Sequence, residues 1–121
     1  MNILITGGAG FIGTNTALYF GKKKNAMITI VDNLSRVGTK HNLAHLTKQL
    51  GKQLVFIHAD ITDTKKYRQA LKKADVVIHL AGQTAVTTSL KDPAHDFTTN
   101  VVGGVSLLEA VRTYNPHPQI R

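Results

Sequence analysis

The sequence predicts an α/β protein built on a doubly wound parallel sheet, and three observations lead to this fold class. Short runs rich in Ile, Val and Leu alternate four times with amphipathic stretches. The short runs are apolar on both faces, as expected of strands that helices cover from both sides. A glycine-rich turn joins the first run to the first amphipathic stretch. Right-handed crossovers then give the strand order 3-2-1-4.

The elements follow in order along residues 1–121, which we expect to form one domain. Strands are expected at residues 2–6, 27–32, 53–58 and 75–80, and helices at residues 11–24, about 41–50, 63–73 and 93–114. The last helix is the best marked, because Asp92 is a natural N-cap, Pro93 suits the first helical position, and Asn115 with Pro116 supplies a stop. Residues 118–121 predict the stub of a fifth strand beyond the fourth.

The last helix also carries an apolar face, which we expect to pack on the sheet. Its members stand four, four, three and three residues apart: Phe97, Val101, Val105, Leu108 and Val111. Gly103 and Gly104 each cost about 1 kcal/mol inside a helix. We therefore expect a strand or a neighbouring helix to approach closely at these two glycines.

Composition limits the classes of protein that the chain can belong to. At 121 residues and 42% hydrophobic it can bury a core, and the absence of cysteine excludes disulfides and thiolate metal sites. We expect a cytoplasmic protein with no membrane partner, because no apolar run is long enough to span a bilayer and no leader pattern precedes the first strand.

The 15 Lys and Arg residues exceed the 7 Asp and Glu residues by 8. The lysines cluster near expected helix ends without an aromatic platform, so no nucleic-acid partner is expected.

The glycine-rich turn has the spacing of a dinucleotide-binding turn. Residues 8–13, GAGFIG, give a literal G-x-G-x-x-G between an expected strand and an expected helix. Such glycines permit a tight turn and a close approach to a pyrophosphate, while the amides at the helix start face the anion. Thr14 and Asn15 follow Gly13, where a P-loop would need Lys and Ser or Thr, so a P-loop is excluded.

An acidic residue stands where this kind of turn requires one. Asp32 closes the second strand 19 residues after Gly13, where a carboxylate accepts hydrogen bonds from the adenosine ribose. The spacing favours NAD, because the carboxylate would repel the 2′-phosphate of NADP. Arg36 could partly offset that repulsion and keeps NADP open as an alternative.

The motif and its surroundings carry a family resemblance. TGGAGFIG, residues 6–13, resembles the TGxxGxxG signature of the extended short-chain dehydrogenases/reductases, which include nucleotide-sugar epimerases and dehydratases. VDNLSR (31–36), HADITD (58–63) and HLAGQTAVTTSLKDP (79–93) resemble further segments of that family. The resemblance implies a Rossmann-like fold that binds NAD, with Asn100 reaching the nicotinamide side. The cofactor contacts that it implies are Gly7, Gly10, Phe11, Ile12, Gly13, Asp32, Asn33, Leu34, Ser35, Arg36, Asp60, Ile61, Leu80, Ala81, Gly82 and Asn100.

The segment after the fourth strand narrows the resemblance. AGQTAVTTSLKDPAHDF is most similar to the CDP-tyvelose (CDP-paratose) 2-epimerases, with UDP-glucose 4-epimerases as a nearby alternative. This similarity implies that the complete enzyme acts on a CDP-sugar or a related nucleotide sugar. Thr87, Thr88 and Ser89 would border that substrate, although a polar loop that caps the next helix explains them nearly as well.

The catalytic residues of the family are absent from this sequence. In the family the base is a Tyr with a Lys four residues later, aided by a Ser or Thr after the fifth strand, and all three lie beyond residue 121. We therefore expect a truncated, NAD-binding portion that is inactive alone and has no catalytic residue. Tyr19 and Lys23 match the spacing but are rejected, because their helix has by then travelled away from the turn.

Two other functions remain open. One is a non-catalytic nucleotide-binding or pairing module that a partner chain completes, with the free edge of the fourth strand favouring a homo-oligomer. The other is an NADP-dependent reductase or dehydratase of the same fold.

The histidines predict no metal site. His41 and His45 stand four residues apart on an expected helix but have no recognisable third ligand, so a solvated helix face is the better explanation. His58 and His79 lie at strand ends, where a buried and hydrogen-bonded imidazole is expected.

Overall fold

The fold is a parallel β-sheet covered by helices on both faces. The computed structural model describes residues 1–115 and the backbone of residues 119–120. Within these residues the sheet has five strands in the order β3-β2-β1-β4-β5. They are β1 (Asn2–Thr6), β2 (Met27–Asp32), β3 (Leu54–His58), β4 (Val76–His79) and β5 (Gln119–Ile120). The predicted doubly wound fold and its fifth-strand stub are therefore confirmed, while Pro116, Pro118 and Arg121 lie outside the described residues.

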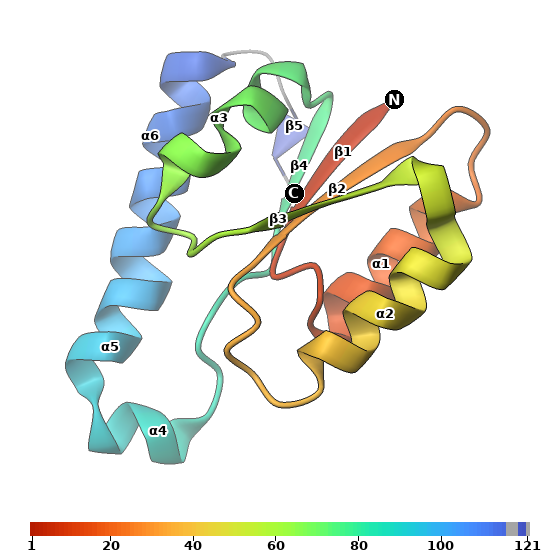
Figure 1. The fold of residues 1–121 in the computed structure, drawn as a ribbon. Helices are drawn as coiled ribbons and strands as arrows, with labels where there is room; N and C mark the ends of the chain where they lie inside the picture. Colours follow the sequence, from red (N-terminus) through yellow and green to blue (C-terminus); the bar gives the residue numbers. More distant parts are fainter. Residues whose placement is uncertain (116–118, 121) are drawn as a thin grey trace.

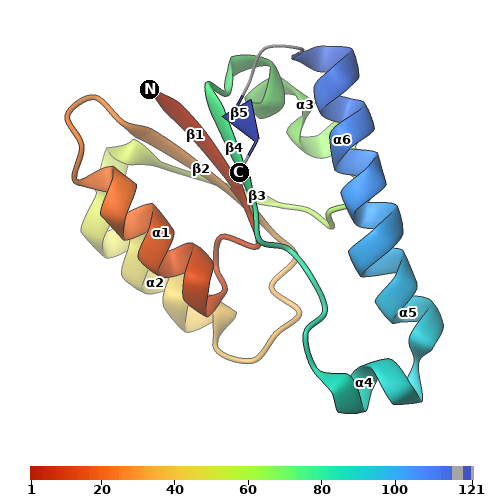
Figure 2. The ribbon, with the colours of Figure 1, turned by 180° about the vertical axis from the view of Figure 1, so that it is seen from behind.

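Two pairs of helices form the outer layers (Figures 1 and 2). The helices α1 (Phe11–Gly21) and α2 (Thr39–Leu50) lie side by side on one face of the sheet. On the other face lie α3 (Thr64–Lys73) and α6 (Gly103–Tyr114). The connecting segments hold η1 (Gly51–Gln53), α4 (Val86–Lys91), α5 (Pro93–Phe97) and the π-helical η2 (Thr98–Val102).

Each face of the sheet has its own hydrophobic core, because strand residues point alternately to the two sides. Ile3 and Ile5 of β1 pack toward α1 and α2, whereas Leu4 packs toward α3 and α6. The first core contains Ile3, Ile5, Ala17, Ala26, Ile28, Ile30, Leu46 and Leu50. The second contains Leu4, Val31, Ala59, Ile61, Tyr67, Leu71, Ala74, Val77, Leu107, Ala110 and Val111. The expectation of strands covered on both faces is confirmed.

Several element ends differ from the expected ones. The helix expected over residues 11–24 ends at Gly21, because Lys23 closes a short turn onto the Phe20 carbonyl and Asn25 adopts a left-handed φ of 61°. The lysines at 22–24 therefore lie beyond α1 and not in its last turn. The second helix begins at Thr39 instead of about residue 41. The short helix α4 was not predicted, since its sequence VTTSLK is rich in β-branched residues with low helix propensity.

The helix expected over residues 93–114 exists as α5, η2 and α6 in succession. Its start is confirmed, because Pro93 is the first residue and Asp92 accepts a hydrogen bond from the His95 N–H at 3.0 Å. A close approach is present at Gly103, where a Cβ would lie 2.5 Å from Ile61 Cγ2, but it comes from the segment between β3 and α3 and not from a strand or helix as expected. The close approach expected at Gly104 is absent, since the nearest atom to a Cβ there would be His79 Nε2 at 3.8 Å, which is an ordinary contact.

The predicted apolar face of this helix is wrong. Four of its five members are 46 to 61% exposed, namely Phe97, Val101, Val105 and Leu108, and only Val111 is buried. The buried residues of α6 are Gly103, Leu107, Ala110 and Val111. For Phe97 and Val101 there are two physical reasons: η2 interrupts the α-helical spacing, and α5 extends past the end of the sheet, as Figure 1 shows. Val105 and Leu108 lie within α6, which turns Leu107, Ala110 and Val111 toward the core instead.

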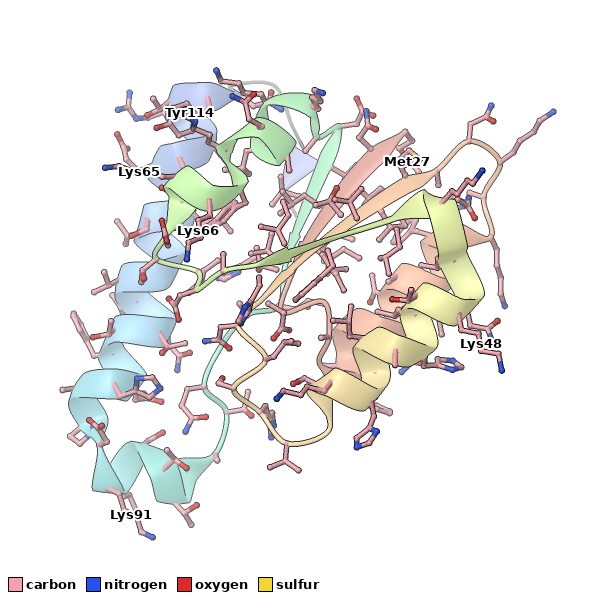
Figure 3. All side chains as sticks on the ribbon, in the orientation of Figure 1. Met27, Lys48, Lys65, Lys66, Lys91 and Tyr114 are labelled. Carbon is pink, nitrogen blue, oxygen red and sulfur yellow. The ribbon has the colours of Figure 1, made fainter. Side chains whose placement is uncertain are left out.

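Positive charge is spread over the helices. Figure 3 shows Lys48 of α2, Lys65 and Lys66 of α3, and Lys91 of α4 extending away from the sheet. Among the described residues, ion pairs form only between Lys66 and Asp63, at 3.2 Å, and between Arg112 and Glu109. In this part of the chain no helix has the length and apolar character that crossing a bilayer would require.

Candidate functional site

A cavity of about 790 Å³ lies at the carboxyl ends of the strands, where the chain order reverses between β1 and β4. Its volume is within the usual range for small-molecule and cofactor sites, and its position is the one predicted from the topology. The predicted residues that line it are Gly7, Gly10, Phe11, Ile12, Gly13, Asp32, Asn33, Ser35, Arg36, Asp60, Ile61, Leu80, Ala81, Gly82 and Thr88. Leu34, Thr87, Ser89 and Asn100 are not among the lining residues.

Other residues of the lining were not predicted. They are Val37, Thr39, Asn42, Ala59, Gln83, Thr84, Ala85, His95 and Thr99. Asn42 is the most informative of them, because its side-chain amide donates to the Ala9 carbonyl at 2.8 Å and ties α2 to the glycine turn. Its partner is 33 residues away, so no local pattern signals the contact.

The glycine turn is packed too tightly for larger residues. Gly7 has a φ of 68°, and a Cβ on it would lie 2.7 Å from the backbone N of Ala81. A Cβ on Gly13 would lie 2.4 Å from the Gly7 carbonyl oxygen. The start of α1 therefore rests directly on the turn, and the turn rests on the segment that follows β4.

This packing leaves amides free at the start of α1. The Gly10 N–H donates to the Gly7 carbonyl at 3.0 Å, and the Thr14 N–H donates to the Gly10 carbonyl at 2.9 Å. The N–H groups of Phe11 and Ile12 have no partner among the described residues. Unpartnered amides at a helix start attract anions.

Asp32 connects the glycine turn to the segment after β2. Its Oδ2 accepts a hydrogen bond from the Ala9 N–H at 3.0 Å, and its Oδ1 accepts one from the Leu34 N–H at 2.8 Å. Leu34 has a left-handed φ of 55° and holds the loop by its backbone instead of its side chain. Each carboxylate oxygen keeps acceptor capacity for a further donor, so Asp32 can support the turn and bind a hydroxyl at once.

Asp60 forms the next part of the wall. Its carboxylate accepts hydrogen bonds from the Asn33 side chain at 3.0 Å and from the Thr62 N–H and hydroxyl at 3.0 and 2.8 Å. Burial acts to raise the pKa of Asp60, but the hydrogen bonds from Thr62 and Asn33, with the nearby His95, leave this pKa lowered. The group is therefore an anion at neutral pH.

His58 and Arg36 belong to the same two segments as these acids, the ends of β3 and β2 with the loops that follow them. His58 forms the predicted hydrogen bond, with the Asn33 carbonyl at 3.0 Å. Its predicted burial is wrong, since His58 is exposed at the end of β3, which is an edge strand of the sheet. Arg36 donates from Nη1 to Thr84 Oγ1 at 2.8 Å. This bond joins the loop after β2 to the loop after β4 across the cavity lining.

Asn100 acts on the loop after β4 and not on the cavity surface. Its Oδ1 accepts from the Gln83 N–H at 2.7 Å, and its Nδ2 donates to the Gln83 carbonyl at 2.9 Å. The hydroxyl of Ser89 is similarly occupied, because it lies 2.8 Å from Asp96 Oδ1. Thr88 is thus the member of the predicted substrate-bordering group that reaches the cavity.

The described residues offer no catalytic pair or metal centre at the cavity. No tyrosine or lysine is among the lining residues. Tyr19 lies on the surface, 62% exposed, with Lys23 Nζ 5.4 Å from its ring centroid. In the part of the chain that the structure describes, no group of three or more His, Asp or Glu side chains could hold a metal ion.

Comparisons with known proteins agree with this arrangement. A family profile described as GDP-mannose 4,6 dehydratase matches residues 4–121. The CDP-paratose 2-epimerase of Salmonella typhi is 43% identical over 99% of this chain and 35% of its own length. The dTDP-glucose 4,6-dehydratase 1 of Escherichia coli K12 is 38% identical over 94% of this chain and 32% of its own length.

A solved structure agrees as well. The UDP-glucose 4-epimerase of Stenotrophomonas maltophilia, with bound NAD and formylated UDP-arabinopyranose, superposes with a TM-score of 0.82 at 31% identity, covering 93% of this chain and 33% of that one. The chain thus spans about a third of the length of these relatives. Because the profile matches nearly the whole chain and the sheet order is the expected one, this chain belongs to the GDP-mannose 4,6-dehydratase family of the extended short-chain dehydrogenases/reductases.

Proposed function

We propose that this chain is the NAD-binding portion of a nucleotide-sugar epimerase or dehydratase. One observation carries the proposal: Phe11 and Ile12, whose N–H groups have no partner among the described residues, line the same cavity of about 790 Å³ as Asp32. A pyrophosphate suits the amides, and ribose hydroxyls suit the carboxylate. The epimerase from Stenotrophomonas maltophilia, solved with bound NAD, supports this assignment.

The proposed roles follow from the contacts of each segment. Gly7, Gly10 and Gly13 bring backbone close to the pyrophosphate, while Asn33, Leu34 and Ser35 shape the loop beside the ribose. Asp60 and Ile61 border the adenine, and residues 80–82 form the opposite wall. Asn100 would act on the nicotinamide side through Gln83, whose backbone it holds. When bound, NAD supplies a hydride acceptor, and this chain's own residues bind and orient it.

For the substrate of the complete enzyme we propose a CDP-sugar. The 43% identity to the CDP-paratose 2-epimerase of Salmonella typhi supports this choice over the uridine and thymidine sugars of other relatives. Thr88 lines the cavity and would border the sugar nucleotide, with Thr87 and Ser89 beside it on α4. We further propose that the 121-residue chain does not turn over substrate alone, because no tyrosine or lysine lines the cavity within the described residues. Epimerisation of a CDP-sugar by the isolated chain, followed by NMR, would contradict this.

Calorimetric titration with NAD tests the cofactor proposal. We expect binding by the wild type, and at least tenfold weaker binding by Asp32→Asn, because this variant loses the charged acceptor for the ribose. Asp75→Asn is the matched control, since Asp75 accepts from the Asn2 N–H at the opposite end of the sheet. No binding at millimolar NAD, or equal affinity for both variants, would refute the proposal.

The same titration with NADP tests the alternative cofactor. Arg36 is the observation that favours NADP, and it already donates to Thr84. Tighter binding of NADP than of NAD would replace the proposed NAD-dependent enzyme with an NADP-dependent reductase or dehydratase of the same fold. The pairing-module alternative is weakened by β5, which occupies the edge of β4 at Val76 and Val77.

A further inference from the structure

A hydroxyl and an imidazole meet where the glycine turn contacts the segment after β4. Thr6 and His79 are paired residues of β1 and β4, and the two side chains lie on the same face of the sheet. Thr6 Oγ1 is 2.7 Å from His79 Nδ1. Thr6 is fully buried and His79 is half-buried, so water does not compete for the threonine oxygen.

The other contacts of Thr6 determine where its proton points. Its Oγ1 accepts a hydrogen bond from the Ala81 N–H at 3.3 Å and shares the Leu80 N–H with the Thr6 carbonyl, the Leu80 nitrogen lying 3.2 Å from Oγ1 and 3.0 Å from the carbonyl oxygen. A hydroxyl has two acceptor positions and one proton. With both positions used, the proton is donated to His79 Nδ1. A neutral imidazole that accepts at Nδ1 carries its own proton on Nε2.

The same hydroxyl connects two sides of the cavity. Gly7 follows Thr6, and a Cβ on Gly7 would lie 2.7 Å from the Ala81 nitrogen and 2.8 Å from the Leu80 carbonyl carbon. Leu80, Ala81 and Gly7 all line the cavity. Thr6 thus holds the Leu80–Ala81 backbone to the glycine turn in two ways: the Leu80 N–H bonds to its carbonyl and its hydroxyl, and the Ala81 N–H bonds to its hydroxyl.

We propose that His79 is a positioning residue of the cofactor site: its neutral Nε2–H ring orients the Thr6 hydroxyl, which keeps the Leu80–Ala81 wall seated on Gly7. The proposal rests on the proposed NAD-binding function only for the identity of the ligand. His79 itself does not line the cavity, and its effect on the cofactor passes through Thr6.

Protonation of His79 would disturb this arrangement. A proton on Nδ1 reverses the hydrogen bond, so that the Thr6 oxygen faces three donors with two acceptor positions. The hydroxyl must then give up a backbone N–H bond. The Leu80 N–H keeps the Thr6 carbonyl as an acceptor, whereas the Ala81 N–H has no second acceptor among the described residues. Cofactor affinity is therefore expected to fall on the acid side of the ordinary histidine pKa of about 6.5.

The surroundings of His79 keep it neutral at pH 7. Burial lowers the pKa of His79, and no charged group contributes to the shift. The strands β1 and β5 beside it contain no ionisable side chain. The ionisable groups of the helices on this face are Lys65, Lys66, Tyr67, Arg68, Lys72 and Lys73 of α3 and Glu109, Arg112 and Tyr114 of α6. Those of α6 begin five residues beyond Gly104, the α6 residue beside Nε2.

Two measurements test the proposal on the whole chain. Nitrogen-15 NMR of the free protein reports the tautomer of His79 without any ligand. NAD titration between pH 7.5 and 5.5 compares Thr6→Val with Thr6→Ser, which keeps the hydroxyl. It also compares His79→Asn with wild type, because asparagine accepts a hydrogen bond but does not titrate. Thr47→Val and His45→Asn are matched controls on the exposed side of α2, where Thr47 bonds only to its own helix.

We expect the Nε2–H tautomer, about tenfold weaker NAD binding for Thr6→Val, and recovery in Thr6→Ser. His79→Asn should bind NAD with near wild-type affinity at pH 7.5 and lose the decline toward pH 5.5. An Nδ1–H tautomer, an unchanged affinity in Thr6→Val, or the same pH profile in His79→Asn would overturn the proposal. If no variant binds NAD, the cofactor proposal fails, and the tautomer and the Leu80 and Ala81 amide shifts in Thr6→Val still decide the role of His79.

Discussion

Gly103 and Gly104 are neighbours in the first turn of α6, and replacing each with alanine separates helix propensity from packing. Either substitution removes the glycine penalty of about 1 kcal/mol. At Gly104 the new Cβ would meet His79 Nε2 at 3.8 Å, an ordinary contact. At Gly103 it would lie 2.5 Å from Ile61 Cγ2, where carbon atoms normally stay at least about 3.5 Å apart. The backbone or Ile61 must therefore move by about 1 Å.

The expected free energies follow from these two distances. Gly104→Ala should raise the free energy of unfolding by about 0.5–1 kcal/mol. Overpacking costs about 1–3 kcal/mol, so Gly103→Ala should lower it by up to about 2 kcal/mol. The variants should differ by about 2 kcal/mol, which corresponds to a difference in Tm of roughly 8 °C for a chain of this size. Urea denaturation measures this difference if the m-values are equal.

A third background identifies the contact responsible. In Ile61→Ala the atom that obstructs the new Cβ is gone, so Gly103→Ala should become stabilising, as Gly104→Ala is. Equal stability of the two alanine variants in the wild-type background would refute the packing argument. So would an unchanged penalty for Gly103→Ala beside Ala at position 61, because the two substitutions would then be additive.

Three further predictions concern stability. Tyr67→Phe should lower the free energy of unfolding by about 1 kcal/mol, because the buried hydroxyl donates to the Ile61 carbonyl at 2.6 Å; Tyr19→Phe, on the surface, should change it little, and equal effects in urea melts would contradict this. Leu107→Ala should lower the free energy of unfolding by about 2–5 kcal/mol and Leu108→Ala by under about 1 kcal/mol, since Leu107 is fully buried and Leu108 is not. Thermal melts in which Leu108→Ala is the less stable variant would contradict the burial of the Leu107 face of α6. The pKa of Asp60 is lowered in the folded chain, so ionised Asp60 stabilises the fold above its ordinary pKa of 3.8, and this stability is lost as the pH falls through the folded pKa. Asp60→Asn should therefore flatten the decline of Tm at acid pH. An unchanged decline would argue against this contribution of Asp60.

The local features of the fold could be predicted from the sequence. The turn needs glycine at Gly7, where φ is 68°, and at Gly13, where a Cβ would lie 2.4 Å from the Gly7 carbonyl oxygen, so its glycines mark it in the sequence. The position of Asp32 follows from the length of one crossover. The strands could also be predicted locally, because a strand that is buried on both faces is apolar at nearly every position of its own sequence.

Features set by distant parts of the chain could not be predicted. The exposure of Val105 and Leu108 depends on where the helix stands relative to the sheet, which no spacing within the helix records. The exposure of His58 depends on β3 being an edge strand. The bond from Arg36 to Thr84 joins residues 48 positions apart. In each case the side chain is compatible with either outcome, and tertiary contacts decide.

The π-helical segment η2 lets the long helix carry one extra residue without rotating its two ends against each other. A π-turn holds about one residue more than an α-turn, so the five residues of η2 turn the chain about as far as four α-helical residues at about 100° each. The helices α5 and α6 therefore keep the relative orientation that one continuous α-helix would give them. Within η2, Asn100 is placed so that it holds the Gln83 backbone with both side-chain atoms. Deleting Val101 or Val102, which do not line the cavity, should therefore leave α5 and α6 in place and disturb only the side chains within η2.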